Sequence, residues 1–188
     1  MAVIYKNSAG KVYYLHAGTT KTGKPKYFFS MKDDGELVEQ IPEGFEIYES
    51  PNDQVFLRRI LPRLISDEEV TLVERELSKV KTVARSRVDR KAEVLSVYVV
   101  ERQNAPPIFE GLGFMSAQLS ERLVQSMPLT AVFQFHLVDQ NDRLFEPYRY
   151  CYRGSIDDWI SVGEAETLDK VVKRYLKHIG KDSYYELF

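Results

Sequence analysis

The sequence contains a glycine- and lysine-rich loop, Gly18-Thr-Thr-Lys-Thr-Gly-Lys24, whose spacing matches most of the loop that binds nucleotide phosphates. That chemistry needs a hydroxyl side chain directly after the last lysine, to hold Mg²⁺, and a helix whose amides point at the phosphates. Residue 25 is a proline, which has no hydroxyl, and Lys26–Ser30 has the pattern of a strand. The loop therefore predicts no nucleotide site.

The same loop is basic and lies beside aromatic residues, with Lys21, Lys24 and Lys26 next to Tyr27. Small β folds bind single-stranded nucleic acid in this way, with lysines on the phosphates and rings stacked on the bases. Alternatively, the rings form the core of a small unit and the lysines keep a hairpin loop in solvent. Residues 1–63 carry 9 basic and 8 acidic side chains, so their net charge does not favour a polyanion.

A second basic stretch follows, in which residues 79–102 carry seven basic and three acidic side chains. If residues 81–89 form a strand, alternation places Lys81, Arg85 and Arg87 on one face. Guanidinium groups bind phosphate and carboxylate bidentately, which suits the two arginines to such a ligand. Alternatively, these charges protect an edge strand from aggregation.

The final predicted helix has four basic side chains opposite its apolar stripe: Lys170, Lys173, Arg174 and Lys177. A basic amphipathic helix can bind a membrane surface or enter the groove of a partner. More commonly, such a helix packs on its own domain with its lysines in solvent, and we expect this arrangement.

Arrangements that would catalyse a reaction have little support. The three histidines are far apart and have no metal-ligand spacing. The adjacent carboxylates of Asp157 and Asp158 could bind a metal or act as acid and base, but Ser155 with Asp158 also matches a helix capping box. A lone cysteine such as Cys151 more often fills a core than acts as a nucleophile. We therefore expect no catalytic residue, no metal ligand and no cofactor.

The composition excludes several classes of protein. The 188 residues carry 26 basic and 28 acidic side chains, a net charge of −2, which argues against a generally basic nucleic-acid or membrane-surface protein. One cysteine excludes an internal disulfide framework and a cysteine-rich zinc site. No run approaches the ~20 apolar residues that cross a bilayer, and the first residues do not resemble a signal peptide. We expect a cytoplasmic protein with no membrane partner.

Two segments with different sequence patterns must position these residues. Residues 1–63 alternate short β-type runs with turn clusters, which predicts a small antiparallel meander or barrel. Residues 64–188 begin with a helix, because Ser66 and Glu69 form a capping box before an apolar stripe. The elements expected after that helix are two strands around a turn at 89–91, a second helix, a hairpin and a final helix, over 81–88, 93–102, 113–127, 129–152 and 167–179.

The predicted fold class is therefore α+β. A small N-terminal all-β unit, residues 1–63, precedes an α+β unit, residues 64–188, with an antiparallel sheet and two to three helices.

Three functions are consistent with the sequence. The leading hypothesis is a non-enzymatic binding or accessory protein that contacts another protein, because aromatic and arginine-bearing surfaces are enriched at interfaces. The alternative is a nucleic-acid-binding protein, and the third is a metal-dependent enzyme of unknown reaction. The candidate binding residues are the same for a nucleic acid or a protein partner: Lys21, Lys24, Lys26, Tyr27, Arg85 and Arg87.

Overall fold

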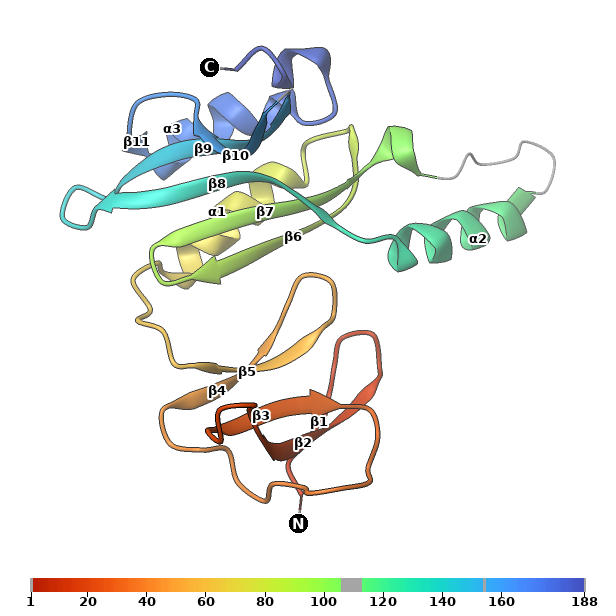
Figure 1. Ribbon diagram of the computed structural model, residues 1–188. Coiled ribbons are helices and arrows are strands. Elements are labelled where there is room, and N and C mark those ends of the chain that lie inside the picture. Colours follow the sequence, from red (N-terminus) through yellow and green to blue (C-terminus); the bar gives the residue numbers. More distant parts are fainter. Residues whose placement is uncertain (1, 106–112, 154, 188) are drawn as a thin grey trace. The chain divides into compact units, whose positions relative to one another are not determined.

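The computed structural model describes residues 2–105, 113–153 and 155–187 (Figure 1). The chain divides into two compact units, Met1–Leu61 and Pro62–Phe188. The described residues form three α-helices and several antiparallel sheets, so the fold is α+β, as the sequence predicts.

The N-terminal unit consists of short strands and turns. Its strands are β1 (Ile4–Lys6), β2 (Val12–Thr19), β3 (Pro25–Ser30), β4 (Phe45–Glu49) and β5 (Val55–Arg59). The first three form one antiparallel sheet, and β4 and β5 form a separate hairpin. Between β3 and β4, Leu37 forms an isolated antiparallel bridge with His16 of β2.

The interior of the N-terminal unit is small. Among its described residues, the buried apolar side chains are Leu15, Pro51 and Val55, whereas its nine aromatic side chains are half-buried or exposed. Phe28 and Phe56, for example, are 40% and 47% exposed. The interpretation that the aromatic residues form the core of this unit is therefore wrong.

The C-terminal unit is built around one larger sheet. Its elements are α1 (Asp67–Leu77), β6 (Val83–Lys91), β7 (Val94–Glu101), α2 (Gly113–Ser126), β8 (Thr130–Asp139), β9 (Leu144–Arg153), β10 (Ile156–Ser161), β11 (Glu166–Thr167) and α3 (Leu168–Tyr175). The strand order is β10-β9-β8-β7-β6, every neighbouring pair is antiparallel, and the short β11 pairs with β9.

The capping box predicted at the start of the first helix is confirmed. The backbone N–H of Glu69 donates to the Ser66 hydroxyl, and the N–H of Ser66 donates to the Glu69 carboxylate at 2.9 Å. The last helix ends earlier than predicted: α3 stops at Tyr175, a 3₁₀ turn spans Leu176–His178, and Gly180 follows with a left-handed φ of +69°. A side chain at residue 180 would also approach the Cβ of Thr82 to 3.0 Å. These local signals fix where α1 begins and where the α3 segment stops.

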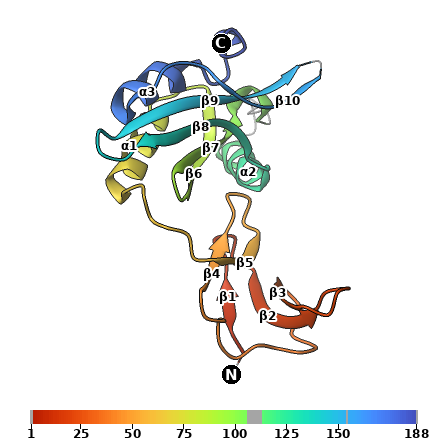
Figure 2. The ribbon, with the colours of Figure 1, turned by 60° about the vertical axis from the view of Figure 1, so that its left-hand side comes forward.

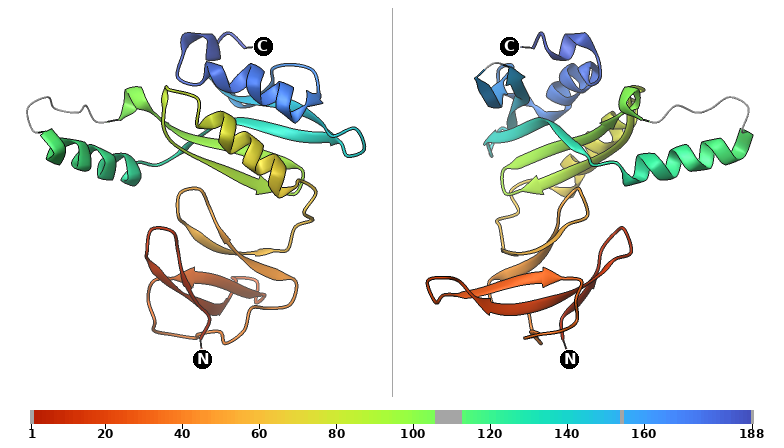
Figure 3. Two further views of the ribbon diagram at one scale, coloured as in Figure 1. Left: turned by 180° about the vertical axis from the view of Figure 1, so that it is seen from behind. Right: turned by 45° about the vertical axis from the view of Figure 1, so that its right-hand side comes forward.

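Helices α1 and α3 cover the same face of the large sheet (Figures 2 and 3). Their apolar stripes pack on residues that alternate along the central strands and are almost completely buried: Leu95, Val97, Phe133, Phe135 and Phe145 from the sheet, and Val73, Leu77, Val171, Val172 and Leu176 from the helical side. This single layer of helices leaves the opposite face of the sheet without a helical cover over β7 to β9 among the described residues (Figure 1).

Three local predictions are wrong. The turn expected at 89–91 lies at Ala92 and Glu93, because β6 continues to Lys91 and pairs with β7 up to the turn. The capping box expected at Ser155 does not form, because residues 156–161 pair with β9 as strand β10. The final helix, expected over 167–179, ends at Tyr175 instead. Helix α2 forms where it is expected, and its Leu119 and Leu123 are 59% and 42% exposed.

Candidate functional site

The face of the large sheet opposite α1 and α3 carries a continuous set of polar and aromatic side chains. Alternation along each strand and the pairing between strands decide its membership. We call this surface the open face, and its residues are Arg85, Arg87 and Asp89 on β6, Ser96 and Tyr98 on β7, Gln134 and His136 on β8, Glu146, Tyr148 and Tyr150 on β9, and Asp157, Trp159 and Ser161 on β10.

His136 and Tyr148 form the centre of the open face. Their rings lie 4.4 Å apart between centroids, and the imidazole Nε2 bonds the Gln134 side-chain oxygen at 2.8 Å. Burial lowers the pKa of His136, although the carboxylates of Glu146 and Glu93 offset part of that effect. The neutral imidazole is therefore favoured near pH 7, and the centre of the face is aromatic and largely uncharged.

A hydrogen-bonded cluster follows toward β10. The carboxylate of Glu146 accepts from the hydroxyl of Tyr148 at 3.0 Å and from that of Ser161 at 2.7 Å. The pKa of Tyr148 is raised, by burial first and then by this hydrogen bond. Tyr148 therefore keeps its proton, and its hydrogen bond to Glu146 holds the ring in position.

Tyr150 and Trp159 extend the set of aromatic side chains that begins with His136 and Tyr148, and we call these four residues the aromatic row. They are partners across β9 and β10, and their rings meet edge to face with 5.3 Å between centroids. The hydroxyl of Tyr150 donates to Asp157, and this hydrogen bond is the main reason that the pKa of Tyr150 is raised. Each large ring on this side thus has a fixed neighbour, which lowers the entropy that a bound partner must overcome.

The β6 side of the open face is more basic. Arg85 and Arg87 point to this face from alternating positions, whereas Asp89 is buried at 8% exposure and pairs with Lys91 at 3.3 Å. On the β9 and β10 side, the charged groups are the carboxylates of Glu146 and Asp157. The open face is therefore positive along one edge, negative along the other and aromatic between them.

Arg85, a candidate from the sequence, has a structural partner. Its guanidinium donates to the carbonyl oxygens of Gln125 at 2.7 Å and Met127 at 3.2 Å, at the C-terminal end of α2. These carbonyls have no partner further along the helix, so a cation there is favourable. Arg87 shares its face, as predicted, but Lys81 does not, because β6 begins at Val83 and its register shifts before Arg85.

The other predicted candidates lie on the β2–β3 hairpin of the N-terminal unit. Lys21, Lys24 and Lys26 are exposed, and Tyr27 is 36% exposed. Lys26 lies 5.5 Å from the ring of Phe28, on one face of the hairpin, and alternation places Tyr27 on the other. These residues therefore share one hairpin but not one surface.

The glycine- and lysine-rich loop is a tight hairpin turn. The N–H of Thr20 donates to the carbonyl of Lys24 at 2.8 Å, and Gly23 supplies the left-handed φ of +77° that the turn needs. The chain continues into β3 rather than a helix. The strand that the sequence predicts after this loop is therefore confirmed.

The acidic pair considered for metal binding is separated by the strand geometry. Asp157 accepts from Tyr150 on the open face, whereas Asp158, on the other face of β10, accepts from the backbone N–H of Trp159 at 2.7 Å. Within the described residues, no group of three or more histidine, cysteine, aspartate or glutamate side chains is placed to hold a metal ion. Cys151 is a free thiol, buried at 5% exposure.

The aromatic row of the open face was not predicted from the sequence. A signal for it exists in the alternation of Tyr148, Tyr150 and Tyr152, which puts three phenol rings on one side of a strand. Alternation does not say which side is covered by helices, and it does not supply the neighbours His136 and Trp159. Those come from the pairing of β8, β9 and β10.

Comparison with family models, with curated proteins and with solved structures finds no match to this chain. Among the described helices, none combines the length and the apolar character that a membrane span requires.

Proposed function

We propose that this is a non-enzymatic binding protein, and that its open face contacts an extended segment of another protein. One observation carries the proposal: a row of half-buried aromatic side chains, each held by a hydrogen bond or a ring contact, lies on the face of the sheet that no described helix covers over β7 to β9. Tyrosine and tryptophan offer a large contact area at a low entropic cost, and both are enriched at protein interfaces.

The distribution of charge favours a protein over a nucleic acid. A strand whose bases stacked on Tyr148 and Tyr150 would carry its phosphates past the carboxylates of Glu146 and Asp157, which repel them. A polypeptide can place acidic side chains near Arg87 and basic side chains near Glu146. The expected partner segment is therefore of mixed charge, with apolar or aromatic side chains in its centre.

The proposal includes no cofactor, and it places the protein in the cytoplasm. The support for that compartment is the lone cysteine, which is buried and unpaired.

Site-specific photo-crosslinking in the cells that make the protein tests the proposal. A benzophenone amino acid replaces Tyr148 on the open face in one version of the full chain and Glu74, exposed on α1, in a control version. We expect protein adducts at residue 148 that are absent at residue 74. Adding Tyr98→Ala should abolish those adducts, and adding Tyr185→Ala, a change at an exposed tyrosine outside the open face, should leave them intact.

Two outcomes would contradict the proposal. Adducts at residue 148 that contain nucleic acid and no protein would establish the alternative function. The same crosslinked adducts at residues 148 and 74, or no adduct at either residue, would show that the open face is not a specific binding surface.

A further inference from the structure

A pocket of about 440 Å³ lies on the helical side of the C-terminal unit, between the end of α1 and the end of α3. It is separate from the open face, which lies on the other side of the sheet. Five lysines line it, from three segments of the chain: Lys79, Lys81, Lys173, Lys177 and Lys181. In the sequence, Lys79 and Lys81 belong to one basic stretch and Lys173 and Lys177 to another, and the fold brings them together with Lys181.

The negative charge at the pocket is small and already neutralised. Its one lining carboxylate, Glu76, is almost buried and accepts from Lys79 at 2.7 Å and from Arg75 at 3.3 Å. These contacts, with Lys79 the largest, lower the pKa of Glu76, so it stays ionised and bound to its own neighbours. Lys173 pairs with Asp169 at 2.8 Å.

The other three lysines of the pocket are Lys81, Lys177 and Lys181. Among the described residues, Lys81, Lys177 and Lys181 form no ion pair with a carboxylate at the pocket. Three like charges around one hollow repel one another, and an anion between them would relieve that repulsion.

The floor of the pocket is apolar and fixed. Val172 and Leu176 are buried at 0% and 1% exposure and belong to the main core. Opposite them, the hydroxyl of Thr82 donates to the carbonyl of Ile179 at 2.6 Å, which ties the start of β6 to the end of the α3 segment. The pocket therefore has a buried apolar base and a rim of exposed ammonium groups.

We infer that this pocket binds a small phosphorylated organic molecule, with its apolar body on the floor and its phosphates among Lys81, Lys177 and Lys181. Ammonium groups bind phosphate as point charges that rotate to fit, which suits a rim of lysines. The volume lies within the range of small-molecule sites, and an apolar base with a few charged groups is their usual composition. This inference does not depend on the function proposed for the open face.

Fluorescence titration of the full chain with trinitrophenyl-ATP tests the inference, because this probe combines an aromatic body with three phosphates. We expect saturable binding with a dissociation constant below about 100 µM. Inorganic triphosphate and adenosine should each compete more weakly than ATP, since each offers only one half of the interaction.

Three charge-reversal variants distinguish this pocket from general surface charge. Lys177→Glu and Lys181→Glu should each weaken binding about tenfold, because both lysines line the pocket. The control is Lys170→Glu, which lies on α3 and makes the same change in net charge, but outside the pocket lining. It should weaken binding less than about twofold.

Three other outcomes would each overturn the inference that this pocket binds a phosphorylated molecule. No saturable binding would show that the lysines are only a solvated rim. An equal loss with Lys170→Glu and Lys177→Glu would show diffuse attraction without a site. Stronger competition by a single-stranded oligonucleotide than by ATP, at equal phosphate concentration, would assign the surface to nucleic acid instead.

Discussion

The ring of Tyr150 on β9 meets the indole of Trp159 on β10 edge to face, with their centroids 5.3 Å apart. Trp159 is the only tryptophan of the chain. The contact lies on the open face, because both side chains occupy that side of their paired strands. Tryptophan fluorescence therefore reports on the proposed binding surface without any label.

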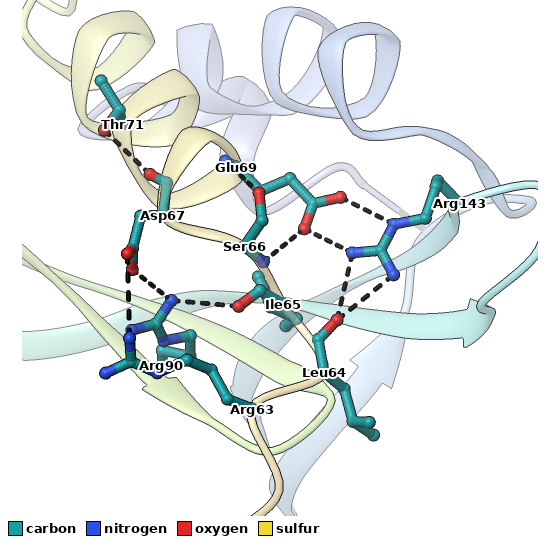
Figure 4. A network of polar contacts seen from close by, with 9 residues as sticks. All are labelled: Arg63, Leu64, Ile65, Ser66, Asp67, Glu69, Thr71, Arg90 and Arg143. Atoms are coloured by element: carbon teal, nitrogen blue, oxygen red, sulfur yellow. Dashed lines mark hydrogen bonds and ion pairs between the residues drawn. The ribbon is translucent and has the colours of Figure 1, made fainter.

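Arg143 is predicted to stabilise the start of α1. Its guanidinium bonds the Glu69 carboxylate through two nitrogens and also donates to the carbonyl of Leu64 (Figure 4). Its backbone has a left-handed φ of +52°, which costs about 1 kcal/mol for a residue with a Cβ. Arg143→Ala should therefore lower the free energy of unfolding by about 2–3 kcal/mol, and Arg143→Gly by about 1 kcal/mol less. Urea unfolding of both variants measures the difference, and equal losses would contradict this account of the backbone.

Arg85 is predicted to hold the end of α2 rather than a ligand. Arg85→Ala removes donors to the carbonyls of Gln125 and Met127, so hydrogen exchange of the amides in residues 119–126 should accelerate about fivefold or more. Arg87→Ala, two residues along the same face, is the matched control and should leave that exchange unchanged. Equal exchange in the wild type and in Arg85→Ala would rule out the capping role.

His136 is predicted to make stability depend on pH. Burial lowers its pKa in the folded state below the ordinary value of 6.5, so the unfolded chain takes up the proton first as the pH falls. The free energy of unfolding is therefore highest above pH 6.5, and it decreases as the pH falls from 6.5 through the folded-state pKa of His136. His178, whose pKa is also lowered by burial, contributes in the same direction.

The variant His136→Gln can still donate to Gln134 but does not titrate. Its urea midpoint should fall less between pH 7 and pH 5 than that of the wild type, and the remaining slope should come from His178. An unchanged slope would show that His136 is not responsible.

The segment between the two units is predicted to be the first site of proteolysis. Residues 60–64 are outside regular structure, Ile60 is 60% exposed, and the side chain of Arg63 is 71% exposed. Trypsin at low concentration should cleave after Arg63 and leave two protected fragments, because each unit has its own sheets. Loss of both fragments at the same rate would mean that neither unit is stable alone.

The features that the sequence predicts well depend on short-range interactions. Ser66 and Glu69 are three residues apart, and the capping box between them needs no other part of the chain. Gly180 likewise adopts the left-handed backbone expected after a helix, although the α-helix itself ends at Tyr175 and a 3₁₀ turn lies between them. The same reasoning fails at Ser155 and Asp158, whose spacing is equally good, because pairing with β9 along residues 156–161 outweighs a single cap.

The features that the sequence does not predict depend on long-range pairing. Arg85 resembles a ligand-binding residue until α2, forty positions later, places its last carbonyls beside the guanidinium. The lysine pocket needs residues about a hundred positions apart, such as Lys81 and Lys181. The open face needs the order of five strands, which alternation within each strand does not determine.

Binding of the protein captured by crosslinking at residue 148 tests the central claim most directly. The segment of the captured partner that binds the open face is purified and added to the wild-type chain. It should change the fluorescence emission of Trp159, and calorimetry should give the dissociation constant. Replacing both Tyr98 and Tyr148 by alanine should weaken binding about 30-fold or more, as for one strong hot spot, whereas Tyr185→Ala should leave it unchanged. An unchanged Trp159 emission, with affinity altered less than threefold in a folded double variant, would contradict the claim that the open face is the binding surface.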